Sequence, residues 1–250
     1  MSSTTAFLAS LVSILIGTVI GMILKRSWLA DRLDGGSKET IRLGAGFLAT
    51  LAALVIGLMI ASAKNTYDAQ NTNIRQLGTD AVLVDQMLTK YGPEAKAART
   101  LLRDIIPSAT QRIWRESIDG DGGSFAVSGN AERFYNAVEG LKPVDAEQTS
   151  LKSRIIEITT DMGRTRLLVF TQSDNAIPVP FFVVLTFWLV VIFASFSLFA
   201  EPNKIVIASI LVFALSVSSA LFLIVDLSHP FSGVMQISNH HLRAVLPKIE

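Results

Sequence analysis

The chain has 250 residues, half of them hydrophobic and only 17% charged, with a formal net charge of +1. Such an apolar, nearly neutral composition excludes an ordinary soluble domain, and it lacks the basic excess typical of nucleic-acid-binding proteins. The absence of cysteine excludes disulfides, thiolate metal ligands and a cysteine nucleophile. An apolar composition of this kind is instead typical of a protein embedded in a membrane.

Four apolar runs carry no charge, and each has about the 20 residues that a helix needs to cross a bilayer. They cover residues 6–24, 43–63, 181–200 and 205–225. These runs predict four transmembrane helices, arranged as two hairpins on either side of a polar block. Lysine and arginine follow the first run instead of preceding it, which favours a retained helix over a signal peptide.

The first connection between paired runs carries an excess of positive charge, and the short second connection carries one lysine. The first connection contains Lys25, Arg26, Arg32, Lys38 and Arg42, and the second contains Lys204. The positive-inside rule places both connections in the cytoplasm. We therefore expect a multi-pass protein of the bacterial inner membrane, with both termini and the central block on the outer, periplasmic side.

The predicted fold class is an all-α integral membrane protein, with two transmembrane hairpins flanking a central extramembrane helical bundle. We expect a first transmembrane hairpin at residues 1–63 and an extramembrane, coiled-coil-like domain at 64–177. A second hairpin follows at 178–226, and an interfacial tail at 227–250.

Within the central block the apolar residues follow a heptad spacing. The first seam consists of Ile74, Leu77, Ala81, Val84, Leu88 and Tyr91. No proline interrupts residues 43–91, so the second transmembrane helix should continue straight out of the bilayer. Gly92 and Pro93 then end this helix and begin the next one. A later helix carries a matching face, on which the seam should pack: Leu151, Ile155, Ile158, Met162 and Thr165.

Small and hydroxyl-bearing residues recur in the predicted spans, where small side chains let helices approach closely in lipid. They favour either packing within one subunit, or an oligomer interface or narrow pore lining. Serines on one face of the last span either line a wet path or bond to their own backbone. The candidate pore or helix-interface residues are Gly17, Gly21, Ala53, Gly57, Ser209, Ser216 and Ser219.

Motifs of catalysis are missing from the sequence: it has no nucleophile elbow, P-loop, zinc-protease motif or dinucleotide fingerprint. The loop from Asp119 to Gly123 lacks the later ligands of a calcium-binding EF-hand. His229, His240 and His241 have no carboxylate at a recognisable ligand spacing. No charge lies in the middle of a span, which argues against a proton-coupled transporter. We therefore expect no enzyme activity and no catalytic, cofactor or metal site.

The end of the last span forms the other candidate site. Pro230 disfavours a helical conformation at His229, and Gly233 permits a sharp turn. We interpret this stretch either as a structural hinge that folds the tail under the outer helices, or as a pore mouth. Its residues are Asp226, His229, Pro230, Phe231, Ser232 and Gly233.

Around this stretch, Asp226 is expected to accept hydrogen bonds from backbone N–H groups two or three residues on, and Ser228, Ser232 and the His229 ring are further candidate partners. Phe231, Val234, Met235 and Ile237 are expected against the membrane interface. Residues 242–249 have the spacing of a short amphipathic helix.

Three segments resemble a bacterial four-helix membrane family that is labelled bestrophin-like. They are VLVDQMLTKYGPEAKAARTLLR (82–103), RTRLL (164–168) and VDLSHPFSGVMQIS (225–238). The most specific part is the ending Asp-x-x-x-Pro-Phe-Ser-Gly. The central motif maps onto Asp85, Leu88, Tyr91, Gly92 and Pro93, while Gln86 stands where family members commonly carry arginine.

The resemblance implies kinship with bestrophin anion channels, which are oligomeric. One hypothesis is therefore an oligomeric ion channel for anions, whose partners are the lipid bilayer and further copies of the chain. The alternative is a non-conducting structural or regulatory membrane protein, whose outer helical domain docks a protein partner. Neither hypothesis involves nucleic acid or a cofactor. The number of subunits discriminates between the two.

Overall fold

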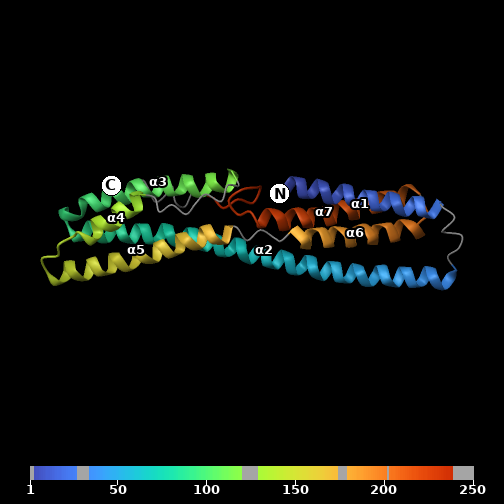
Figure 1. Ribbon diagram of the computed structural model, residues 1–250, viewed down its shortest axis with the longest axis horizontal. Helices are drawn as coiled ribbons and strands as arrows, with labels where there is room; N and C mark the ends of the chain where they lie inside the picture. The colour runs from blue at the N-terminus through green and yellow to red at the C-terminus, as the bar shows by residue number, and fades with distance from the viewer. Residues whose placement is uncertain (1–2, 27–33, 120–128, 174–178, 202, 239–250) are drawn as a thin grey trace. The chain divides into compact units, whose positions relative to one another are not determined.

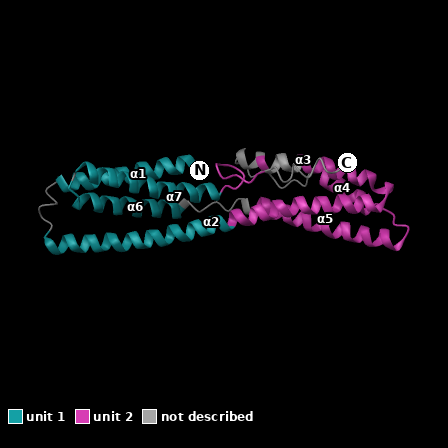
Figure 2. Ribbon diagram, turned by 180° about the vertical axis from the view of Figure 1, so that it is seen from behind, with its two compact units in different colours: residues 1–65, 176–228 teal, residues 66–175, 229–250 magenta. Residues whose placement is uncertain are grey.

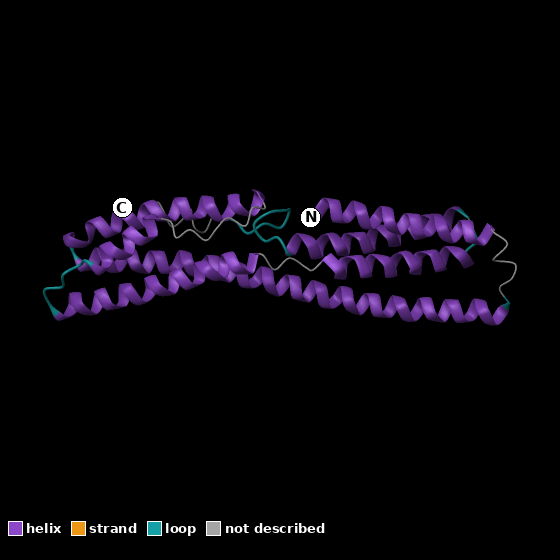
Figure 3. Ribbon diagram, in the orientation of Figure 1, coloured by secondary structure: helices purple, strands orange, loops and turns teal. Residues whose placement is uncertain are grey.

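The computed structural model describes residues 3–26, 34–119, 129–173, 179–201 and 203–238 (Figure 1). Within these ranges the backbone is helical, joined by short turns, and contains no strand (Figure 3). Four helices are long and apolar enough to cross a membrane: α1 (Ser3–Arg26), α2 (Gly35–Tyr91), α6 (Val179–Phe199) and α7 (Lys204–Leu227). The predicted all-α membrane fold is confirmed.

The chain divides into two compact units (Figure 2). Unit 1 comprises residues 1–65 and 176–228, and unit 2 comprises residues 66–175 and 229–250. α2 contributes to both units because it runs from Gly35 to Tyr91 without a break. The sequence predicts this continuity, since no proline or run of glycines interrupts the helix after its first turns.

Unit 1 contains the membrane-spanning segments. α1 packs against α6 and α7. The core of unit 1 includes Ile14, Leu185, Leu221 and, from α2, Ala52. Large apolar side chains on the outward faces remain exposed, for example Phe47 and Phe187 at 68% and 62%. Such a surface fits hydrocarbon, because lipid tails solvate apolar side chains as well as a protein core does.

Two basic residues of the first connection stabilise the end of α6. The Lys25 ammonium donates a hydrogen bond to the Ala200 carbonyl at 2.6 Å. The Arg42 guanidinium lies over the Phe199 ring, 5.6 Å from its centroid. Cations are favourable at the C-terminal end of a helix, where carbonyl groups lack helical partners. These residues therefore have a structural role in addition to any effect on orientation.

Unit 2 is a helical bundle built from the end of α2, a short 3₁₀ helix η2 (Pro93–Ala95), α3 (Lys96–Asp119), α4 (Gly129–Glu139) and α5 (Ala146–Ser173). The predicted seam of α2 is buried, with Val84 0% and Leu88 1% exposed. It packs with Ile155 and Ile158 of α5, so the predicted contact between these faces is confirmed.

α4 is an element that the sequence analysis misses. It is a short helix that buries only Phe134 and Val138 in the bundle. Their spacing of one helical turn is a weak signal, because the surrounding residues are mostly polar. α4 therefore depends on packing against α3 and α5, with which it makes its contacts.

Candidate functional site

The end of α7 is the point where the chain passes from unit 1 to unit 2, between Ser228 and His229. The helix ends at Leu227, as the following proline predicts. Ser228 donates its backbone N–H and its hydroxyl to the Ile224 carbonyl, at 3.2 and 2.7 Å. The hydroxyl of Ser228 therefore donates to the backbone of α7. Asp226 itself is buried.

Residues 229–238 form a loop that is closed by its own backbone. The Ser232 N–H donates to the His229 carbonyl at 3.1 Å, and the Ile237 N–H donates to the Pro230 carbonyl at 2.7 Å. Gly233 has a φ of 113°, a conformation that glycine adopts without the steric cost that other residues meet. The sharp turn that the sequence analysis places at Gly233 is therefore present.

Phe231 anchors this loop to α3. Its ring meets the Trp114 ring edge-on, with centroids 5.4 Å apart and planes at 74°. The Trp114 indole N–H donates to the Ile237 carbonyl at 3.2 Å. Phe231 and Ile237 are buried with Ile74 and Val169 in unit 2. Phe231 and Ile237 are thus packed in the bundle, whereas Val234 and Met235 of the same loop are exposed.

Replacing Phe231 by leucine should lower the free energy of unfolding by about 1 kcal/mol, because it keeps the bulk but removes the edge-to-face ring contact. Thermal unfolding of the full chain in detergent measures this loss. Met235→Leu is the matched control, since Met235 is 45% exposed in the same loop. Equal midpoints for the two variants would show that the ring pair does not hold the loop.

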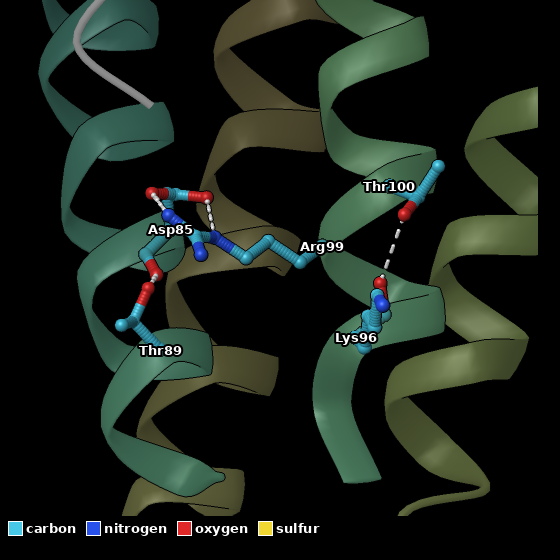
Figure 4. Close-up of polar contacts among 5 residues, drawn as sticks. All are labelled: Asp85, Thr89, Lys96, Arg99 and Thr100. Carbon is cyan, nitrogen blue, oxygen red and sulfur yellow. Dashed lines mark hydrogen bonds and ion pairs between the residues drawn. The ribbon is translucent and has the colours of Figure 1, made fainter. Parts of the chain in front are cut away.

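A partly buried ion pair joins α2 to α3 (Figure 4). The Arg99 guanidinium donates to both carboxylate oxygens of Asp85, at 2.7 Å from Nε and 3.0 Å from Nη2. The Asp85 side chain is 8% exposed and that of Arg99 is 24% exposed. The hydrogen bond that Arg99 donates to the Asp85 carboxylate raises the pKa of Arg99 above its ordinary value. Two parallel hydrogen bonds fix the position of one helix against the other.

The sequence analysis identifies Asp85 through the family motif but not its partner. The signal for Arg99 is its position: Asp85 and Arg99 lie at equal distances on either side of Gly92, where the chain reverses. In a hairpin of two antiparallel helices, residues placed in this way lie opposite each other. The ion pair at Asp85 forms although the next residue, Gln86, carries no charge.

The turn between α2 and α3 is fixed by side chains of α5. Gly92 has a φ of 120°, and a Cβ added there would meet the Glu94 carboxylate. Gln148 donates a hydrogen bond from Nε2 to the Tyr91 carbonyl at 3.0 Å. Tyr91 is 2% exposed, and this burial raises the pKa of its hydroxyl. The Tyr-Gly-Pro motif therefore forms a rigid turn at the end of the bundle, as the sequence predicts.

Asp80 is a second buried acid of α2. Its carboxylate accepts a hydrogen bond from the Gln76 amide at 2.9 Å. Burial raises the pKa of Asp80, and the charge of Asp161 adds to this effect. The folded bundle therefore favours the protonated carboxyl of Asp80, so its contribution to stability declines as pH rises through this pKa.

Gly17 and Gly21 pack α1 against α6. A Cβ at Gly17 would lie 2.7 Å from the Val190 carbonyl oxygen, and one at Gly21 would overlap the backbone of Ala194. Only glycine permits so close an approach of the two helices. In this chain both glycines pack within one subunit.

Ala53 and Gly57 lie on an exposed face of α2 instead. A Cβ added at Gly46 or Gly57 would meet nothing within 4 Å. We call this exposed line of small residues the α2 stripe; it consists of Gly46, Thr50, Ala53, Gly57 and Ala61. Among the residues that the structure describes, no neighbour close to Gly46 or Gly57 requires a small side chain there.

The serines of α7 differ in their hydrogen bonds. Ser216 and Ser219 are exposed and donate to the carbonyls of Val212 and Leu215, one turn earlier, both at 2.8 Å. This is the backbone bonding that hydroxyls in membrane helices commonly make. Ser209, which is half-buried, makes no hydrogen bond to a described residue.

Acidic and histidine side chains do not cluster in threes anywhere in the described part of the chain. Most of the loop 119–123, His240, His241 and the tail segment 242–249 lie outside the described residues.

A family model described as Bestrophin-like domain matches residues 12–242. The match runs from α1 past the loop that follows α7, and so includes the Asp85 motif and the Phe231 loop. No curated protein and no solved structure matches the chain.

Proposed function

The chain belongs to the bestrophin-like family, and from this membership we propose that it is an oligomeric ion channel for anions. A pore has to form between copies, because apolar side chains such as Ile14, Leu185 and Leu221 fill the core of unit 1. A single set of four packed helices encloses too little space for an ion path.

The observation that carries this proposal is the α2 stripe. Small exposed residues make few van der Waals contacts with lipid, but they let the backbone of another helix come close. The stripe lies on the one transmembrane helix that continues into the bundle of unit 2. We assign the stripe, with Ala53 and Gly57 at its centre, to the contact between subunits and the narrow wall of the pore.

The outward serines of α7 are less suited to an anion path. An anion needs hydrogen-bond donors, but Ser216 and Ser219 already donate to their own helix. They present acceptor oxygens instead. The hydroxyl of Thr50 in the α2 stripe donates to its own helix as well, so the choice of α2 for the pore wall rests on the small size of its exposed residues.

In the proposed orientation both basic connections lie in the cytoplasm, and the termini and unit 2 lie outside a bacterial inner membrane. The stretch from Asp226 to Gly233 then acts as a hinge where the last transmembrane helix gives way to the outer domain. A reporter enzyme fused after Glu250 should be active only on the outer side. Cytoplasmic activity from this fusion would reverse the orientation.

The alternative function, docking of a protein partner by the outer helical domain, is favoured by apolar side chains exposed on unit 2. They are Leu83, Tyr135, Val144, Leu167, Leu168, Val234 and Met235. Exposed apolar residues of this kind occur at protein interfaces. They fit a contact between copies equally well, so they do not by themselves separate the two functions.

Conductance of the purified full chain in planar bilayers tests the proposed function. In a KCl gradient the current should reverse near the equilibrium potential of chloride. Gly57→Leu should abolish the current, since it places a branched side chain on the α2 stripe. An intact oligomer without conductance would reject the channel and favour docking.

A further inference from the structure

A shallow groove of about 440 Å³ lies on the outward face of α7, at the start of the helix. Its floor is low because Ala208 and Ser209 are small, whereas Ile205, Val212 and Phe213 project and are 76%, 57% and 58% exposed. The buried residues of α7, such as Ile210 and Ala214, point into the core of unit 1. The groove therefore opens away from the subunit, on the side where a transmembrane helix meets lipid.

Lys204 forms the charged end of this groove. It lies where the polar connection after α6 gives way to the apolar part of α7. Its ammonium makes no hydrogen bond or ion pair with any residue that the structure describes, unlike Lys25, which caps α6. The positive end of the helix dipole adds to this charge. The position therefore favours a negative group at the membrane surface.

Ser209 supplies a hydrogen-bond donor deeper in the groove. Its hydroxyl has no partner among the described residues, whereas Ser216 and Ser219 on the same face donate to their own helix. Ser209 lies five residues beyond Lys204, which is roughly 7 Å along the helix. The polar headgroup region of one leaflet is about as thick as this, roughly 5–7 Å.

From this order of charge, hydroxyl and apolar surface we propose that the groove binds one anionic phospholipid. Lys204 pairs with the headgroup phosphate, Ser209 donates to the ester region, and an acyl chain lies against Val212 and Phe213. Basic residues beside a membrane span attract anionic lipids in this way. The site does not depend on whether the protein conducts ions.

Native mass spectrometry of the full chain, with phosphatidylglycerol or phosphatidylethanolamine added, tests the site. We expect one tightly bound phosphatidylglycerol per chain. Lys204→Glu should weaken it at least about fivefold, as the loss of one lysine contact implies, and Ala208→Trp should weaken it by filling the groove. Lys38→Glu removes an exposed charge at the start of α2, outside the groove, and should leave binding unchanged.

Lys204→Gln removes the charge but keeps a polar, unbranched side chain, so it should also weaken binding while leaving the thermal midpoint unchanged, even if Lys204→Glu folds poorly. Equal losses in Lys204→Glu and Lys38→Glu, or equal binding of the two lipids, would reject a specific anionic site. If Ala208→Trp lowers the subunit number but leaves the lipid count intact, a second copy of the chain occupies the groove and the proposal is overturned.

Discussion

Replacing Arg99 by alanine is expected to lower the free energy of unfolding by about 3 kcal/mol, because it leaves the Asp85 carboxylate buried without its cation. The loss is large because both carboxylate oxygens depend on this guanidinium. Chemical unfolding of the full chain in detergent, followed by circular dichroism, measures it. Hydrogen exchange should also speed up locally in the facing parts of α2 and α3.

Two variants separate the buried pair from an ordinary surface charge. The double variant Asp85→Leu with Arg99→Met removes both charges, so it should recover most of the stability lost in Arg99→Ala. Lys90→Ala breaks an ion pair with Glu147 whose side chains are 66% and 64% exposed, and should cause no measurable change. A loss as small for Arg99→Ala as for Lys90→Ala would contradict the structural role of the buried pair.

Gly21→Leu is expected to destabilise unit 1 by about 3 kcal/mol, because the new side chain cannot fit against the backbone of α6. The structure leaves no room there even for a Cβ beside Ala194. The expected result is a marked fall of the thermal midpoint in detergent. Gly17→Leu should act in the same direction, since Val190 crowds that position.

Gly57→Leu is the matched control, because it is the same substitution at a glycine with nothing within 4 Å. We expect this variant to keep its helical content and the fold of each subunit, but to lower the subunit number. An equal loss of helical content in the Gly21 and Gly57 variants would mean that Gly57 packs within the subunit. In that case the α2 stripe would not be the subunit contact.

The transmembrane fold was predictable because its signals are local. Length and absence of charge define each span, and the heptad seam with Gly92 and Pro93 defines the first outer helices. Each of these features depends on residues that are close together in the chain, so a single sequence is enough to recognise it. The segment from Asp226 to Gly233 likewise predicts the end of α7, because it contains Pro230.

What the sequence did not reveal depends on distant partners. Arg99 of α3 pairs with Asp85 of α2 across the turn between the two helices. Trp114 of α3 contacts the Phe231 loop, which lies more than a hundred residues later in the sequence. α4 forms only because α3 and α5 offer it a surface. Periodicity cannot separate the packed glycines of α1 from the exposed stripe of α2, because both have the same spacing of small residues.

The number of subunits tests the central claim most directly, because a pore between copies requires a closed ring. Light scattering of the detergent-solubilised full chain, corrected for bound detergent, gives this number. The account predicts a ring of about four or more copies, and a smaller number for Gly57→Leu. A monomer or a compact dimer for the unaltered chain would contradict the channel and favour docking of a partner.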